Sequence, residues 1–392
     1  MKINEEKIKE ILERGVEDII DRDHFGKILK SGKKLRVKFG VDPTAPDLHL
    51  GHMVLLRKLL QFQNAGHRAV LIVGDFTARI GDPSGKSEER KMLSEKEIKH
   101  NMKTYFAQAG KILNMEKTEV RYNGEWFGAR DSLSKIFKLA RAGSMQQILR
   151  RADFKKRLDS GRDVTVLEML YPLMQGYDSV VVKADVELGG SDQRFNLLMG
   201  RKIQRHFGVP EQDVLIMPLL EGTDGARKMS KSYGNYIALS EKPNNLFAKI
   251  MSVPDKLVQK YFLLLSDISD SELKHIEQMS FLERKKRLAF EITGFLHSEM
   301  AAKKAEEYFE RTFSKKEIPE ELKIYRAEMN EVWADFLVRE KLAKSRSEAK
   351  RLIEGGGLDF NGRKITRANG QISESGTVKV GKHKFIKIEV RS

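Results

Sequence analysis

The sequence predicts an α/β protein whose first half is built on a parallel β-sheet and whose second half is helical, with a small α+β domain at its end. Two apolar runs, 34–39 and 69–73, lie on either side of a helix-length segment, a spacing typical of a parallel βαβ unit. Residues 243–313 carry apolar positions at helical spacing, and 358–365 alternates around an Asn-Gly turn. We therefore expect a Rossmann-like parallel-sheet domain, then a helical domain, then a small α+β domain.

Composition limits the class of protein. The 392 residues suffice for two or three domains, and 72 Lys or Arg against 56 Asp or Glu give a net charge of +16. Such an excess favours polyanionic partners, although a charged solvated surface also accounts for it. The absence of cysteine excludes disulfides and thiolate metal sites. Because residues 1–10 are charged and no apolar run of about 18 residues occurs, we expect a cytoplasmic protein without a membrane span.

The segment from Val41 to His52 combines a loop with the start of a helix. Residues 2–30 before it are predicted to be helical, and Gly40 is expected to end the first strand. His49 and His52 share one face of a helical turn, and Asp47 is a suitable cap for that helix. A helix start favours an anion such as a triphosphate. For an isolated match, a solvated or core-satisfied histidine pair is the default, and half a metal site is disfavoured because no third ligand is nearby.

Residues 80–87 resemble a phosphate-binding P-loop only superficially. The Walker pattern requires glycine where Ile80 stands, and Pro83 removes a backbone donor. A polar loop carrying Lys86 and Arg90 is the better interpretation. From Ser94 to Arg162 the pattern is largely helical, with a basic run that is either a solvated face or an RNA-facing patch. Its members are Arg150, Arg151, Lys155, Lys156 and Arg157.

A helix predicted over residues 167–178 carries three polar groups on one face. Tyr171, Gln175 and Asp178 stand at i, i+4 and i+7. Buried without partners they would be costly, so they either bind a polar ligand or satisfy one another internally. A strand and the loop Gly189-Gly190-Ser191-Asp192-Gln193 follow, offering close backbone approach, an acceptor for hydroxyls and an amide.

A second strand, residues 214–217, leads through a glycine-containing loop to Lys228-Met229-Ser230-Lys231-Ser232. Two lysines in an accessible loop can close on phosphates and leave again. This pentapeptide resembles the KMSKS signature, and residues 41–52 the HIGH signature, of class I aminoacyl-tRNA synthetases. With the Gly-Asp-Pro-Ser-Gly loop at 81–85, the Tyr171 helix and the Gly-Gly-Ser-Asp-Gln loop in the same order, the chain resembles bacterial-type tyrosyl-tRNA synthetases along nearly its whole length.

That resemblance implies ATP-dependent activation of L-tyrosine to tyrosyl adenylate, then transfer of tyrosine to the 3′-terminal ribose of tRNA(Tyr). It implies Mg²⁺ with ATP, no protein-bound metal, and a homodimer. Its catalytic residues would be Thr44, His49, His52, Lys86, Arg90, Lys228 and Lys231. Tyrosine would be bound by Asp82, Tyr171, Gln175, Asp178 and Gln193, with Asp178 on the phenol hydroxyl. ATP would be bound by Asp42, Gly51, Gly190, Asp192, Lys228, Ser230, Lys231 and Ser232.

Two residues depart from the family pattern. Many bacterial members have tyrosine in place of Lys38, as a second contact to the substrate hydroxyl, and a small residue in place of Phe39 beside the ribose. The recognition of hydroxyl and ribose in this chain therefore differs in detail, while the ATP signatures are intact.

The C-terminal part resembles the small RNA-binding module that a ribosomal small-subunit protein shares with these synthetases. Residues 329–392 hold fourteen Lys or Arg and eight Asp or Glu, so a phosphate-binding surface is expected, with a solvated basic surface as the alternative. Ser345 and Glu348 have capping-box spacing before a helix. The candidate RNA-binding residues are Arg339, Lys341, Lys344, Arg346, Lys350 and Arg351.

The expected domains are a catalytic domain (1–225), the KMSKS loop (226–240), a helical anticodon-region domain (241–314), a linker (315–328) and the RNA-binding domain (329–392). Three other functions remain open. They are a tryptophanyl-type synthetase, an inactive RNA-binding protein on the same scaffold, and a P-loop nucleotidase. The Tyr171 helix and the terminal module argue against the first, the intact His49, His52, Lys228 and Lys231 against the second, and Ile80 against the third.

Overall fold

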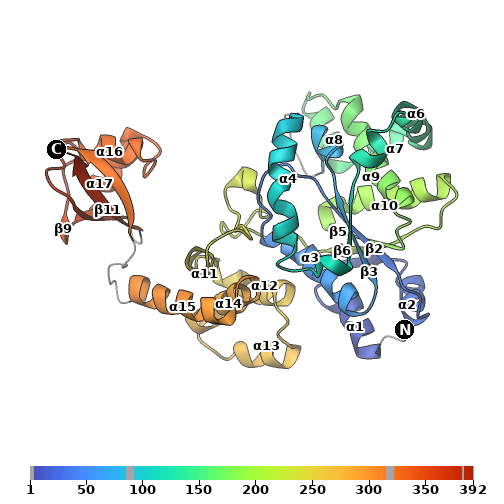
Figure 1. Cartoon of the computed structure of the whole chain (residues 1–392), viewed down its shortest axis with the longest axis horizontal. Coiled ribbons are helices and arrows are strands. Elements are labelled where there is room, and N and C mark those ends of the chain that lie inside the picture. Colours follow the sequence, from blue (N-terminus) through green and yellow to red (C-terminus); the bar gives the residue numbers. More distant parts are fainter. Residues whose placement is uncertain (1–3, 85–91, 315–321, 382–383, 392) are drawn as a thin grey trace. The chain divides into compact units, whose positions relative to one another are not determined.

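The computed structural model describes residues 4–84, 92–314, 322–381 and 384–391. The chain falls into two compact units, residues 1–302 and 303–392. Within the described residues, the large unit contains a six-stranded sheet surrounded by helices, and the small unit contains a five-stranded sheet (Figure 1). No helix in these ranges is both long and apolar enough to cross a membrane.

The large sheet has the strand order β1-β6-β5-β2-β3-β4. Its strands are β1 (Asp18–Ile20), β2 (Arg36–Val41), β3 (Arg68–Val73), β4 (Thr118–Tyr122), β5 (Val186–Gly190) and β6 (Asp213–Met217). β1 pairs antiparallel with β6, and all other neighbours pair parallel, so the predicted parallel sheet is confirmed. Because β3 and β5 flank β2, the strand order reverses around β2. Ligands of open α/β sheets bind beyond the carboxyl ends of the strands at such a point.

Helices cover both faces of this sheet. They are α1 (Glu5–Glu13), α2 (Arg22–Lys30), α3 (Leu50–Asn64), α4 (Glu95–Ala109), α5 (Gly124–Phe127), α6 (Ser132–Ala142), α7 (Met145–Leu149), α8 (Ala152–Asp159), α9 (Val166–Val181) and α10 (Arg194–His206). Phe39 of β2 faces α3 and α4, whereas its neighbour Lys38 binds α9 on the opposite face. α9 approaches α10 closely because Gly176 lies against Gly200, where a Cβ would be 3.3 Å from the Gly200 Cα.

Two segments that the sequence predicted to be helical each contain a strand. The helix predicted over residues 2–30 is divided by β1, because Gly15 adopts a positive φ of 63° after α1 and Ile19 is buried at the edge of the sheet. The segment predicted to be largely helical from Ser94 to Arg162 contains β4, which pairs with β3. β4 is only five residues long, and its apolar content is low for a parallel strand.

The predicted helical region after Ser240 is confirmed. It contains α11 (Pro243–Met251), α12 (Val258–Leu265), α13 (Asp270–Ile276), α14 (Phe281–Leu296) and α15 (Glu299–Phe309), the last followed by a π-helical turn, Glu310–Ser314. Leu246, Phe262 and Leu288 of these helices are almost fully buried, and α14 packs against both α11 and α12, while α12 also packs against α3.

The small unit packs two helices on a sheet of order β7-β11-β10-β8-β9. Its elements are β7 (Lys323–Glu328), α16 (Trp333–Arg339), α17 (Arg346–Glu354), β8 (Leu358–Phe360), β9 (Arg363–Lys364), β10 (Gly376–Val380) and β11 (Lys384–Arg391). Residues 323–328, assigned from the sequence to a linker, instead form β7, which pairs parallel with β11. The predicted hairpin is confirmed, with Asn361 and Gly362 both at positive φ.

Candidate active site

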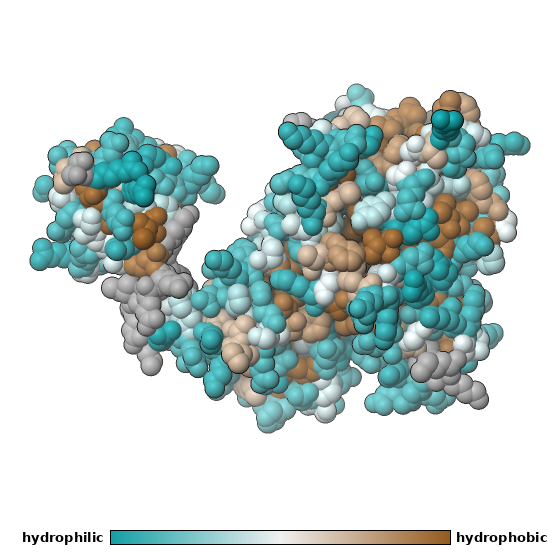
Figure 2. Space-filling view, in the orientation of Figure 1, coloured by the Kyte–Doolittle hydropathy of each residue, from teal (hydrophilic) through white to brown (hydrophobic). Residues whose placement is uncertain are grey.

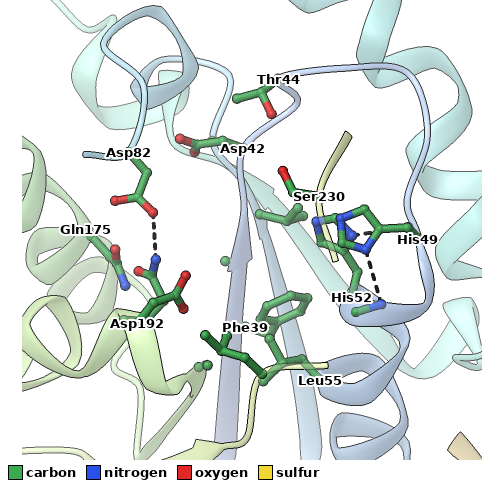
Figure 3. Close-up of a pocket in the computed structure, with 18 of the residues that line it drawn as sticks. Phe39, Asp42, Thr44, His49, His52, Leu55, Asp82, Gln175, Asp192 and Ser230 are labelled. Carbon is green, nitrogen blue, oxygen red and sulfur yellow. Dashed lines mark hydrogen bonds between the residues drawn. The ribbon is translucent and has the colours of Figure 1, made fainter. Parts of the chain in front are cut away.

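A cavity of about 650 Å³ lies beyond the carboxyl ends of β2, β3, β5 and β6. Its size is in the range of small-molecule sites. The wall combines apolar residues such as Leu55 with the polar side chains that the sequence singled out (Figure 3). This cavity is lined by residues of four separate segments: the two signatures, the polar face of α9 and the Gly-Gly-Ser-Asp-Gln loop.

The histidine signature forms the start of α3. His49 is the N-cap, and its Nδ1 accepts from the Gly51 backbone N–H at 3.1 Å. The His49 backbone N–H in turn donates to His52 Nδ1 at 3.2 Å, and the two rings lie 4.0 Å apart between centroids. The expectation that Asp47 caps this helix is wrong. Asp47 lies two residues before the N-cap and accepts from the Ser240 hydroxyl at 2.6 Å instead.

Both histidines are neutral at physiological pH. Burial lowers the pKa of His52 to about 3, with the Lys231 charge adding to the effect. Burial also holds the pKa of His49 well below 6.5, helped by His52, Lys231 and Lys228. Since each Nδ1 accepts a backbone hydrogen bond, each ring carries its proton on Nε2. The pair can therefore donate two N–H groups to an anion.

The loop that carries Thr44 is fixed by α4. Asn101 Nδ2 donates to the Pro43 carbonyl at 2.9 Å, and the Tyr105 hydroxyl donates to the Ala45 carbonyl at 2.8 Å. Thr44 consequently stands at the rim of the cavity (Figure 3).

The lysine signature lies beside the histidine signature, since a Cβ on Gly51 would be 3.9 Å from the Met229 Cβ, and Figure 3 shows Ser230 next to His49 and His52. The Lys228 ammonium is 2.6 Å from Asp192 Oδ2, and Lys231 Nζ donates to the Ala45 carbonyl at 3.3 Å. Burial lowers the pKa of Lys231 to about 8, against a raising effect of Asp47. Ser230 and Ser232 also line the cavity. The two signatures, predicted to work together from positions far apart in sequence, are thus brought into one site.

The three polar residues of α9 all line the cavity, as their spacing predicted. The Tyr171 hydroxyl donates to Asp42 Oδ2 at 2.8 Å, and the Thr77 hydroxyl donates to Asp42 Oδ1 at 2.8 Å. Asp42, expected among the ATP ligands, lines the same cavity and is hydrogen-bonded to Tyr171 and Thr77. Asp178 is 4% exposed, and burial raises its pKa to about 7.

Asp82 and Gln193 join the loops after β3 and β5. Gln193 Nε2 donates to Asp82 Oδ2 at 2.6 Å (Figure 3), and its Oε1 accepts from Asn196 Nδ2 at 2.9 Å. Gly51, Gly190 and Asp192 also line the cavity. The predicted residues Lys86 and Arg90 lie outside the described residues.

Sequence reasoning missed the residues that hold Asp178. Trp126 Nε1 donates to Asp178 Oδ1 at 2.9 Å, and Asn123 Nδ2 donates to Oδ2 at 3.4 Å. Asn123 follows β4 directly and Trp126 lies in the short helix α5 just after it, so predicting that strand would have placed both near the carboxyl edge of the sheet.

Two members of the basic run at 150–157 are neither on a solvated face nor in a surface patch that could meet RNA. Arg151 is buried and bonded to Asp153, Asn196 and Ser84. Arg157 is buried with Glu168 at 2.5 Å. Both stabilise the packing of the helices around the site.

The candidate RNA-binding residues lie in the small unit. Arg339 is paired with Glu331 at 2.8 Å, Arg346 with Asp335 at 3.0 Å, and Lys350 lies 3.7 Å from Glu354. Lys341, Lys344 and Arg351 complete the set. Ser345 caps α17 as predicted, accepting from the Glu348 N–H, whereas the Glu348 carboxylate binds the Lys344 N–H.

Comparison with known proteins agrees with this geometry. Residues 30–314 match the family described as tRNA synthetases class I (W and Y), and residues 334–378 match the S4 domain. The Tyrosine--tRNA ligases of Thermotoga maritima and Aquifex aeolicus are each 48% identical, covering 98% and 96% of this chain and 97% of each relative.

Solved structures share the fold. A C-terminally truncated mitochondrial tyrosyl-tRNA synthetase of Aspergillus nidulans matches with a TM-score of 0.68 at 22% identity, over 78% of this chain and 94% of that one. A tryptophanyl-tRNA synthetase of Plasmodium falciparum matches with a TM-score of 0.58 at 16% identity, over 78% and 90%. The fold alone therefore does not separate the two kinds of enzyme, but the full-length relatives do. The chain belongs to the tyrosine–tRNA ligases, a family of class I tRNA synthetases with an S4 domain.

Proposed function

We propose that this chain activates L-tyrosine with ATP and then transfers tyrosine to the 3′-terminal ribose of tRNA(Tyr). The observation that supports this most directly is the convergence of both signatures and the polar face of α9 on one cavity. In the first step the tyrosine carboxylate attacks the α-phosphorus, and the bond to pyrophosphate breaks. In the second step a ribose hydroxyl attacks the tyrosyl carbonyl, and AMP leaves. Neither step needs a protein nucleophile, so catalysis consists of alignment and charge stabilisation.

The phosphates of ATP are assigned to the two signatures. Thr44 and His49 bind the leaving phosphates and His52 the nucleotide, because a neutral imidazole donates a hydrogen bond without adding charge to a crowded basic site. Lys228 and Lys231, with Lys86 and Arg90, neutralise the charge that develops on pyrophosphate. ATP enters as its magnesium complex. Asp192 accepts from the ribose, with Asp42, Gly51, Gly190, Ser230 and Ser232 around the nucleotide.

The amino acid is assigned to the group on α9. Asp82, Tyr171 and Gln175 hold the ammonium, with Asp42 behind Tyr171, and Gln193 lies near the carboxylate. Asp178 accepts from the phenol hydroxyl. Phenylalanine lacks that hydroxyl, so its binding would leave a buried carboxylate with one partner fewer, which is the basis of discrimination.

The small unit is assigned to tRNA. Arg339, Lys341, Lys344, Arg346, Lys350 and Arg351 would contact phosphates, which position a nucleic acid without reading its sequence.

A homodimer is supported by apolar side chains that stay exposed on the helices around α9. Leu133, Phe137, Met145, Leu158, Val166 and Leu198 are between 39% and 70% exposed. In Figure 2, brown side chains appear at the end of the large unit where Figure 1 places α6 and α7. Exposed apolar patches of this kind mark interaction surfaces. We assign the protein to the cytoplasm, where its substrates occur.

Pyrophosphate exchange tests the proposal. Labelled pyrophosphate should enter ATP in the presence of Mg²⁺ and tyrosine, and with none of the other nineteen amino acids. Exchange with tryptophan would establish the alternative specificity, and no exchange with any amino acid would favour an RNA-binding protein without catalysis.

A further inference from the structure

A buried ion pair lies directly behind the part of the cavity assigned to tyrosine. Lys38 of β2 and Glu187 of β5 are partners across the parallel pair, and their charged groups are 2.8 Å apart. Their exposures are 0% and 1%. Charges buried this deeply are tolerated only when paired and fully hydrogen-bonded, and removal of one partner is strongly destabilising. Because burying these two charges is costly, we asked which contacts of the cavity they support.

Lys38 ties the sheet to α9. Besides Glu187, its ammonium donates to the Gln175 carbonyl at 2.9 Å and to the Ser179 hydroxyl at 2.8 Å. An ammonium has three protons, so these three acceptors satisfy it completely. The turn of α9 that Lys38 holds is the one that presents Gln175 and Asp178 to the cavity.

Glu187 fixes the orientation of the Gln175 amide. Its Oε1 accepts from Gln175 Nε2 at 3.1 Å, and its Oε2 accepts from the Ser179 hydroxyl at 3.1 Å and from Gln212 Nε2. An ionised carboxylate can only accept hydrogen bonds, so the amide nitrogen must face Glu187. The Gln175 amide oxygen is then left for the cavity (Figure 3), as recognition of an ammonium group requires.

The pair also sets the charge around Asp178. Among the described residues, the charged side chains that act on Asp178 are Lys38 of β2, which lowers its pKa, and Glu187 of β5, which raises it. Trp126 and Asn123 approach as neutral donors. With both charges present their effects oppose each other. Without Lys38, the repulsion between the Glu187 and Asp178 carboxylates would have no buried cation to offset it.

We infer that Lys38 and Glu187 are positioning residues for tyrosine selection, which orient the Gln175 amide toward the substrate ammonium and keep Asp178 able to accept from the substrate phenol. They act through Gln175 and Asp178 and not on the reacting atoms. This inference rests on the proposed function. The inference gives a role to Lys38, which departs from the family pattern, and to Glu187, which no sequence pattern marks.

The test compares full-length Lys38→Met, Glu187→Gln and the double variant. Lys38→Met should raise KM for tyrosine about 10-fold or more in pyrophosphate exchange, the size expected when a buried charge loses its partner, with KM for ATP within about twofold of wild type. The double variant, which removes both charges, should recover most of that loss. Such coupling is what a double-mutant cycle measures.

A pH profile separates positioning from a merely structural role. In Lys38→Met the acid limb of kcat/KM for tyrosine should move to higher pH, because the ammonium no longer favours the ionised form of Asp178, and it should return toward wild type in the double variant. Lys58→Met is the matched control. Lys58 is also a buried lysine, but it binds the carbonyls of Ile11 and Arg14 away from the cavity, so this variant should lower stability and leave KM for tyrosine unchanged.

Each other result has a defined meaning. Unchanged KM for tyrosine and an unmoved acid limb in Lys38→Met, or equal losses in Lys38→Met and the double variant, would overturn the inference. If Lys38→Met does not fold, Ser179→Ala decides, since it removes one partner of both charged groups. It should raise KM for tyrosine about two- to tenfold, and no change would overturn the inference. Failure of the wild type to use tyrosine would instead refute the proposed function itself.

Discussion

The Lys228 ammonium lies 2.6 Å from the carboxylate of Asp192. The lysine belongs to the segment assigned to pyrophosphate, and the aspartate is assigned to the ribose, so ATP must exchange this contact for its own when it binds. Asp192→Asn should therefore raise KM for ATP about 10- to 100-fold, the range for losing a hydrogen bond to a charged group. The affinity for tyrosine, measured by equilibrium dialysis without ATP, should not change. Asp163→Asn, an exposed acid, is the control. A normal KM for ATP would remove Asp192 from the nucleotide site.

Asp178 should determine the choice between tyrosine and phenylalanine. Asp178→Asn keeps the size of the side chain but replaces one acceptor with a donor, so KM for tyrosine should rise and the ratio of kcat/KM for tyrosine over phenylalanine should fall about 10- to 100-fold. Exchange assays with each amino acid measure both, with KM for ATP as the internal control. Unchanged tyrosine kinetics would exclude Asp178 from the substrate pocket.

The partly buried histidines should leave a signature in the pH dependence of stability. Folded His52 takes up its proton near pH 3, whereas the unfolded residue does so near 6.5, so the unfolded state binds more protons between these values. The stabilisation that the neutral His52 gives the folded state is therefore fully present above pH 6.5 and is lost as the pH falls. The midpoint of urea unfolding should drop less between pH 7.5 and 5.5 in His52→Gln than in wild type. Tyrosine-dependent pyrophosphate exchange should be slower in this variant at every pH. Equal drops in both proteins would show that the fold does not hold His52 in its neutral form.

The small unit should matter for tRNA and not for adenylate formation. A chain that ends at residue 314 is the appropriate truncation, because a cut near residue 330 would leave β7 without its partner β11. It should retain pyrophosphate exchange and aminoacylate tRNA poorly. In the full-length chain, Lys344→Ala with Arg351→Ala should weaken tRNA binding and lower its salt slope by about one or two units. Normal aminoacylation by the truncated chain would rule out the RNA-binding role.

The exposed apolar side chains on α6 should lie in a dimer interface. Phe137 is 64% exposed, and Phe137→Glu should convert a dimer to a monomer in sedimentation analysis, because the charge cannot be buried there without a partner. Phe281, 55% exposed on α14, supplies the control Phe281→Glu, which should leave the assembly unchanged. A wild-type protein that sediments as a monomer would refute the dimer.

The main features of the site could be predicted because its groups are local in sequence. Tyr171, Gln175 and Asp178 are placed on one face by helical periodicity alone, and His49 and His52 by a single turn. Which residue begins α3 could not be predicted, because Asp47 has the better capping chemistry, and only the contacts of Asp47 with Ser240 and of His49 with Gly51 decide between them.

Contacts between segments far apart in the sequence were harder to predict. Trp126 and Asn123 reach Asp178 only because β4 adds to the edge of the sheet, and β4 is too short and too polar to be recognised by its pattern. Lys38 and Glu187 meet through the register of two strands that are about 150 residues apart in the chain, which no local pattern encodes. Family resemblance identified Lys38 as unusual, but its partner had to come from the structure.

The central claim is that this cavity forms tyrosyl adenylate and delivers tyrosine to tRNA. The most direct measurement incubates the enzyme with Mg-ATP, pyrophosphatase and an equimolar mixture of the twenty amino acids, and identifies the enzyme-bound adenylate by mass spectrometry before and after tRNA is added. We predict tyrosyl adenylate alone, at about one per active site, and its conversion to tyrosyl-tRNA and AMP. Adenylate of another amino acid, or none, would contradict the account.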